Sequence, residues 1–113
     1  MIAEQEKIFT LYILRCGDGK FYIGITSKLE DRMNSHKLIH KEFAEKTRQW
    51  TKYHQPVELV FTLNDIKNAR IARRIEKYLK VWTKDKKERL VSGDKILEDR
   101  LNNFHLQLLD ISS

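Results

Sequence analysis

The strongest constraint in this sequence is a pair of short apolar segments joined by a glycine-rich turn. Residues 8–16 and 20–26 are rich in aliphatic and aromatic side chains, and Gly17-Asp18-Gly19 separates them. Such segments around a short glycine-containing loop are typical of an antiparallel β-hairpin. The chain must therefore fold around this hairpin, and its register decides which side chains share a face.

Two turn geometries are possible, and they give different registers. A two-residue turn places Tyr12 and Tyr22 on opposite faces, whereas a three-residue loop with a left-handed Gly19 pairs Tyr12 with Gly24 and Leu14 with Tyr22. Only the three-residue loop gathers the alternating apolar side chains on one face: Phe9, Leu11, Ile13, Phe21, Ile23 and Ile25. Because a one-residue slip would break that face, we expect the three-residue loop, with both tyrosines and Gly24 on the opposite face.

A capping box predicts a helix directly after the hairpin. Ser27 is expected at the N-cap and Glu30 at the third helical position, and the helix should run to about His40. Residues 41–54 are ambiguous and are expected to form a further helical piece, followed by a loop that ends at Pro56. Residues 57–63 have the composition of a third strand.

The remainder of the chain is predicted to be helical. Asn64 or Asp65 should cap a helix that continues to about Trp82 without glycine or proline. Residues 83–91 fit a short charged helix or a loop. After a break at residues 92–94, a final helix carries one apolar stripe: Leu97, Leu101, Phe104 and Leu108.

The size and composition fit a single domain. The chain has 113 residues, of which 41% are hydrophobic and 34% are charged, enough apolar surface for one core. We expect an α+β fold, a three-stranded antiparallel sheet flanked by helices, over residues 8–91, with residues 92–113 as a helical extension packed on it. One cysteine, no signal-like start and no apolar run near about 18 residues favour a soluble, cytoplasmic protein.

The charge of the chain points towards polyanionic partners. The formal net charge is +6, which favours nucleic acid first and an anionic membrane second. Residues 46–53 interleave cations and aromatics, as nucleic-acid grooves do, although Trp50 could equally be a core residue beside a solvated face. Residues 84–89 carry charges of both signs and are expected to be solvated or to contact phosphates.

Two polar residues fall on the apolar side of the first predicted helix. At about 100° per residue, Arg32 and His36 lie in the inward arc of Leu29, Met33, Ile39 and Phe43. A guanidinium there is costly unless it is paired or meets a ligand. The alternatives are an arginine paired with a buried acid and a hydrogen-bonded core histidine; a zinc site with His40 lacks a third ligand.

The long helix repeats this anomaly with a carboxylate. Its apolar side consists of Ile71, Ile75, Tyr78, Leu79 and Trp82. Glu76 lies at the edge of that side between Ala69 and Ala72, with Arg73 and Lys80 beside it. It can form an i,i+4 ion pair with Lys80, worth a few tenths of a kcal/mol, or hold a hard metal ion next to a phosphate.

Taken in order, these residues resemble the GIY-YIG nuclease family. Thr10-Leu11-Tyr12 stands at the first motif and Tyr22-Ile23-Gly24 follows ten residues later, and then come Arg32, His36 and Glu76. The resemblance covers roughly residues 8–91. Thr10 replaces the glycine of the first motif, the segment from Lys37 to Thr51 lacks a Gly-rich loop, and a late asparagine of some members has no match.

The resemblance implies a hydrolytic attack on a phosphodiester bond by water. Tyr12 would act as the general base or as a proton relay, with His36 as the alternative proton acceptor, and Tyr22 would orient the water or the phosphate. Gly24 would allow the substrate backbone to approach the sheet.

The resemblance also implies a metal and a phosphate clamp. Glu76 would hold a single Mg²⁺ or Mn²⁺ ion, and Arg32 would bind a non-bridging phosphate oxygen. Further contacts to the substrate are expected from one glycine and five cations: Gly24, Lys46, Arg48, Lys52, Arg73 and Lys80.

We therefore expect a metal-dependent endonuclease that acts on DNA, with RNA not excluded, and that works as a monomer or a weak homodimer without a membrane. Because phosphate contacts carry no sequence information, cutting should be structure-directed or of low sequence specificity. The alternatives are a nucleic-acid-binding module that retains the fold without cutting, and a protein-interaction domain whose final helix exposes its apolar stripe.

Overall fold

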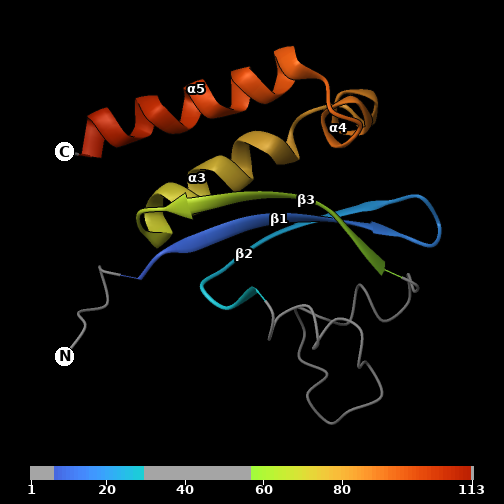
Figure 1. Ribbon diagram of the computed structural model, residues 1–113, viewed down its shortest axis with the longest axis horizontal. Coiled ribbons are helices and arrows are strands. Elements are labelled where there is room, and N and C mark those ends of the chain that lie inside the picture. The colour runs from blue at the N-terminus through green and yellow to red at the C-terminus, as the bar shows by residue number, and fades with distance from the viewer. Residues whose placement is uncertain (1–6, 30–56, 113) are drawn as a thin grey trace, which may run out of the picture.

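The computed structural model describes residues 7–29 and 57–112 of the chain. In this part of the protein, three strands and three helices follow one another (Figure 1): β1 (Phe9–Cys16), β2 (Phe21–Thr26), β3 (Val57–Ile66), α3 (Ala69–Lys80), α4 (Lys84–Val91) and α5 (Lys95–Ser112). The strands form one antiparallel sheet in the order β2-β1-β3. In Figure 1, α3 runs along the sheet and α5 lies beyond α3. The predicted fold class, a three-stranded antiparallel sheet flanked by helices, is confirmed.

The hairpin has the predicted register. Tyr12 pairs with Gly24 and Leu14 pairs with Tyr22. The loop is closed by two backbone hydrogen bonds: the Gly19 N–H donates to the Cys16 carbonyl at 2.8 Å, and the Cys16 N–H donates to the Lys20 carbonyl at 2.9 Å. Gly19 has a φ of 85°, so its lack of a Cβ permits this left-handed turn.

The two faces of the hairpin have separate packing partners. On one face, Leu11, Ile13 and Ile23 join the main core, to which α3 contributes Ile71 and Ile75. A smaller cluster on the other face contains two tyrosines and three aliphatic side chains: Tyr12, Leu14, Tyr22, Leu29 and Val57. The alternation of the strands thus separates the main core from the tyrosines, because successive side chains point to opposite faces.

The third strand is longer than predicted, and the helix after it starts later. β3 continues to Ile66, which is fully buried and pairs with Phe9. The predicted cap at Asn64 or Asp65 is therefore wrong. The cap is Asn68, whose Oδ1 accepts the Ile71 N–H at 2.9 Å. Strand pairing and burial of Ile66 outweigh the local capping signals, since Asn68 supplies the same hydrogen bond a few residues further on.

The helix that follows β3 also ends earlier than predicted. α3 stops at Lys80, two residues before the predicted Trp82, and residues 84–91 form α4. Thr83 caps α4, because its Oγ1 accepts the Lys86 N–H at 3.2 Å. A capping threonine shortly after the long helix therefore starts a separate helix instead of extending the first one.

The final helix packs against α3. Leu97, Leu101 and Leu108 belong to the main core, and Phe104 stacks on Tyr78 of α3 with ring centroids 4.0 Å apart. The alternative of a protein-interaction domain that exposes this apolar stripe is therefore wrong. The stripe is covered by α3 of the same chain.

Candidate active site

The two tyrosines of the hairpin form a packed pair. Tyr12 is 1% exposed and Tyr22 is half-buried. Their ring centroids are 6.2 Å apart, and the rings are tilted by 32°, a separation at which aromatic rings interact favourably. The pair arises from the hairpin register, because Tyr22 pairs with Leu14, two residues along β1 from Tyr12.

Gly24 makes room for the end of the Tyr12 side chain. A Cβ at position 24 would lie 2.6 Å from the Tyr12 Oη and 2.7 Å from its Cζ, well inside van der Waals contact. The sequence interpretation assigned this glycine to the approach of a substrate backbone. The structure gives it another role, since the phenol of Tyr12 lies over the bare backbone of Gly24.

Glu76 lies on α3 with its side chain 20% exposed. Its Oε2 is 3.1 Å from the Nζ of Lys80, so the i,i+4 pair is formed. Ala72, one turn earlier, is fully buried, and the carboxylate therefore lies at the border between the core and solvent. A metal ion at Glu76 would compete with the ammonium group of Lys80 for the carboxylate.

Glu76 and the tyrosines belong to different layers of the molecule. α3 packs on the Leu11 and Ile13 face of the sheet, whereas Tyr12 lies on the other face. Along α3, Glu76 and Tyr78 are about 160° apart around the axis, and the Tyr78 flank contacts α5. α3 also contacts β2, an edge strand of the described sheet. Glu76 thus lies on the flank of α3 that faces away from Tyr78.

The solvent-facing side of α3 is strongly basic. Arg73 is exposed, and the Lys80 side chain is 55% exposed. Five cations occupy this side: Arg70, Arg73, Arg74, Lys77 and Lys80. A surface of one sign attracts polyanions, and two members of this face, Arg73 and Lys80, were predicted to contact substrate.

Five of the predicted site residues fall outside the described residues. They lie between positions 30 and 56: Arg32, His36, Lys46, Arg48 and Lys52. The described part of the site brings together Tyr12, Tyr22 and Gly24. The convergence of the arginine, the histidine and Glu76 on the same phosphate stays a prediction.

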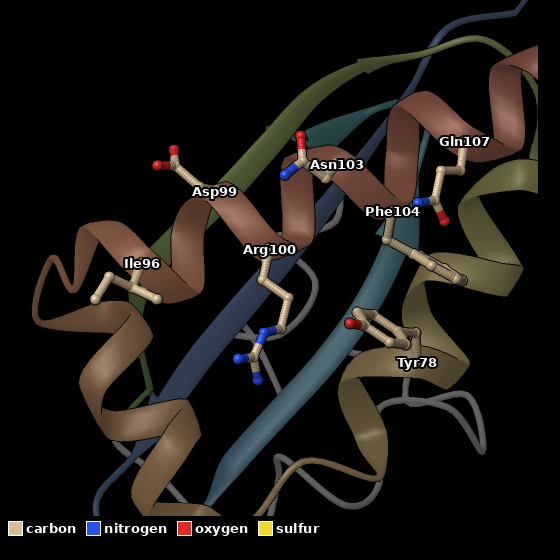
Figure 2. A pocket seen from close by; sticks show the side chains of 7 residues that line it. All are labelled: Tyr78, Ile96, Asp99, Arg100, Asn103, Phe104 and Gln107. Carbon is tan, nitrogen blue, oxygen red and sulfur yellow. The ribbon is translucent and has the colours of Figure 1, made fainter.

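A groove between α3 and α5 contains none of the predicted catalytic residues. It has a volume of about 400 Å³ and is lined by seven residues (Figure 2): Tyr78, Ile96, Asp99, Arg100, Asn103, Phe104 and Gln107. The rings of Tyr78 and Phe104 face each other at one end, and Arg100 extends into the space beside Tyr78. This groove belongs to the Tyr78 flank of α3, away from Glu76.

A second cavity joins two regions that are far apart in the sequence. Lys20 and Phe21 of the hairpin and Lys84 and Lys87 of α4 line a space of about 230 Å³. The charged segment 84–89 was noted in the sequence, but its contact with the hairpin was missed. No local pattern relates the two segments, because only the packing of α4 against the hairpin brings them together.

The donor chemistry of the described residues fits a lightly coordinated divalent ion. No group of three or more His, Cys, Asp or Glu residues within residues 7–29 and 57–112 is arranged to hold a metal. Mg²⁺ commonly binds one or two carboxylates and keeps several water ligands. Glu76, partly exposed and at the border of the core, suits such a site.

Cys16 is a buried free cysteine. Burial, with a smaller contribution from Asp18, raises the pKa of the Cys16 thiol to about 11, so this cysteine is largely un-ionised at neutral pH and unsuited to nucleophilic chemistry.

Among the described helices, none has the length and apolar character required to cross a membrane.

Comparison with known proteins identifies a family that matches most of the chain. The GIY-YIG catalytic domain matches residues 8–89. UPF0213 protein YazA of Bacillus subtilis is 34% identical over 68% of this chain and 71% of its own length. UPF0213 protein CPE1444 of Clostridium perfringens is 33% identical over 79% of this chain and 88% of its own. UPF0213 protein YhbQ of Escherichia coli is 32% identical over 91% of this chain and 94% of its own. No solved structure matches.

Proposed function

Because the chain belongs to the GIY-YIG family, whose catalytic domain is of the nuclease type, we propose that it is a divalent-metal-dependent endonuclease that hydrolyses DNA. Cutting is directed by the shape of the substrate or has low sequence specificity, since the basic surface of α3 offers charge rather than base-specific contacts. The observation that best supports this proposal is the Tyr12–Tyr22 pair over Gly24. Tyr12, Tyr22 and Gly24 lie on the same face of the hairpin, and they belong to the two sequence motifs by which the chain resembles the family.

The scissile phosphate is proposed to lie at the β2 edge of the sheet. β2 carries Tyr22 and Gly24 and is in contact with α3. Because β2 is an edge strand of the described sheet, this proposal requires the Glu76 flank of α3 to reach the same edge as the tyrosine face. A phosphate there can meet the phenols from one side and the carboxylate from the other.

The two tyrosines have different proposed tasks because their exposure differs. Tyr22 is half-buried, so its hydroxyl can orient the attacking water or a phosphate oxygen. Tyr12 is almost completely buried and acts as the base or as a relay. An ordinary phenol has a pKa near 10, so a neighbouring cation must favour its ionised form, or His36 must accept the proton instead. Arg32 is assigned to a non-bridging phosphate oxygen.

Glu76 is proposed to hold the divalent ion, Mg²⁺ or Mn²⁺. When bound, such an ion stabilises negative charge on the phosphate and on the leaving oxygen. Lys80 must first release the carboxylate, and its ammonium group is then available to a neighbouring phosphate. Arg73 lies on the same exposed side of α3 and adds charge to that contact.

A nuclease assay tests this proposal. Duplex, flap, branched and single-stranded DNA, with a matched RNA, are incubated with the protein in Mn²⁺, Mg²⁺ or chelator. We expect cutting of at least one DNA substrate that requires a divalent ion and falls by at least 100-fold in Glu76→Gln and Tyr12→Phe. The matched control is Glu98→Gln, which removes the acid of a similar exposed pair, Lys95–Glu98 at 3.5 Å. Cutting that survives chelation, or that falls equally in the control, would refute the mechanism.

The second candidate is a nucleic-acid-binding module that does not cut. The Glu76–Lys80 pair favours it, because an ammonium group occupies the carboxylate assigned to the metal. Binding to DNA without cutting on any substrate, in any of the divalent ions, would select this candidate.

A further inference from the structure

The cavity between the hairpin loop and α4 is surrounded by positive charge. Three lysines, Lys20, Lys84 and Lys87, line it together with the ring of Phe21. Lys84 is directed towards the hairpin loop, since its Nζ is 3.8 Å from the position that a Cβ on Gly19 would occupy. Three lysine side chains around about 230 Å³ concentrate positive charge, and an anion between them would offset their mutual repulsion.

Glu88 of α4 is paired with Arg15 and not with the cavity lysines. The guanidinium Nη2 of Arg15 is 2.8 Å from the Glu88 Oε1. Asp18 accepts the backbone N–H of Lys20 at 3.1 Å, and Asp85 belongs to the first turn of α4. In the part of the chain that the structure describes, the ion pairs of this region do not include the three cavity lysines.

The environment of Lys87 also disfavours its charged form. Its Nζ donates to the carbonyl oxygen of Lys80 at 3.3 Å, which brings α4 and the end of α3 together. Burial, and secondarily the charge of Lys80, lower the pKa of Lys87. An anion beside Lys87 would relieve both effects, because it would stabilise the charged ammonium group.

Lys80 links the Glu76 region of α3 to the cavity. Lys80 follows Glu76 by four residues, a rise of about 6 Å along α3, and the Lys80 carbonyl is in contact with Lys87. Lys80 itself stands between the two places, with its ammonium group on Glu76.

We propose that Lys20, Lys84 and Lys87 form a binding site for a phosphate of the nucleic-acid strand, separate from the phosphate at Glu76. The ring of Phe21 forms the apolar wall of this site, and Arg15 lies over the ring at 5.6 Å. The three lysines could bind a free phosphate ion as well as a phosphate of a nucleic-acid strand. The choice of the strand as ligand rests on the proposed function. The continuous basic side of α3 next to it favours the strand.

Binding in chelator tests the site without any cutting. The affinity of a fluorescent duplex is measured by anisotropy over a range of salt concentrations for wild type, Lys84→Gln/Lys87→Gln and a matched control, Lys95→Gln/Arg100→Gln. Both variants remove two helical cations, so a general charge effect is the same in each. We expect the cavity variant to bind at least fivefold more weakly than the control. Its slope of log affinity against log salt should be smaller by about 1, the effect of one lost phosphate contact.

Three further measurements make the outcome unambiguous. Lys84→Arg/Lys87→Arg should restore binding, and the melting temperatures of all variants report on folding. Amide chemical shifts of the wild type at residues 19–21 and 83–87 should change with the duplex and much less with inorganic phosphate at equal phosphate concentration. Equal loss in the cavity and control variants, or shifts with inorganic phosphate alone, would overturn the inference. A protein that binds in this way but never cuts would refute only the proposed function.

Discussion

Replacement of Gly24 by alanine tests the packing of the tyrosine pair directly. In a strand without steric conflict, Gly→Ala should stabilise the fold by about 0.5–1 kcal/mol, because glycine loses more conformational freedom on folding. Here the new Cβ would lie 2.6 Å from the Tyr12 Oη and 2.7 Å from Cζ. The ring must therefore move, and it is 1% exposed and packed against Tyr22.

Overpacking of this kind costs about 1–3 kcal/mol, so Gly24→Ala should lower the free energy of unfolding by about 1–2 kcal/mol. Urea denaturation followed by circular dichroism measures this value. The Tyr12→Phe background serves as the control, because it removes Oη but leaves Cζ in conflict. The alanine penalty should therefore shrink without disappearing.

A Gly24→Ala protein as stable as the wild type, or more stable, would refute the described placement of the Tyr12 ring. Equal penalties in the wild-type and Tyr12→Phe backgrounds would show that the hydroxyl does not lie over residue 24. If the proposed mechanism is right, the same substitution should also reduce cleavage, since it displaces the Tyr12 hydroxyl.

Three other predictions concern the N-cap of α3 and the burial of His105 and Cys16. Asn68→Ala should cost about 0.5–2 kcal/mol of unfolding free energy through loss of the α3 cap, whereas Asn64→Ala should cost far less in the same urea titration; equal costs would contradict the observed start of α3. Burial lowers the pKa of His105, so the unfolded chain takes up a proton more readily, and stability should fall as the pH drops below about 6.5. Melting temperatures of His105→Gln should show a weaker decline than those of the wild type as the pH is lowered through this range, and parallel curves would exclude this histidine as a cause. Native Cys16, with a pKa of about 11, should react with iodoacetamide in mildly alkaline buffer only after unfolding by urea, and rapid labelling of the folded protein would contradict its burial.

The hairpin was predictable because its information is local. The alternation of apolar side chains and the glycine-containing loop admit one register that buries a continuous face, and the structure has that register. The pairing of Tyr12 with Gly24 and the shared face of the two tyrosines follow from it. The i,i+4 pair of Glu76 with Lys80 was equally accessible, because helix geometry alone brings these positions together.

The boundaries around α3 were not predictable in the same way. Asn64, Asp65 and Asn68 are all acceptable caps, and the choice among them depends on the pairing of Ile66 with Phe9 across the sheet. Two competing signals also meet at the end of α3. The apolar pattern continues to Trp82, but Thr83 caps a new helix, and α3 ends before it.

The sequence by itself determined the two strands of the hairpin, the side on which each hairpin residue lies, and the family to which the chain belongs, because periodicity and motif spacing are properties of neighbouring residues. Only the tertiary structure decided that Tyr12 fills the space above Gly24, that the final helix is covered by α3, and that Lys20 meets Lys84 and Lys87 around one cavity. These features arise from the packing of elements distant along the chain, where the burial of a whole surface, rather than any local preference, selects the arrangement.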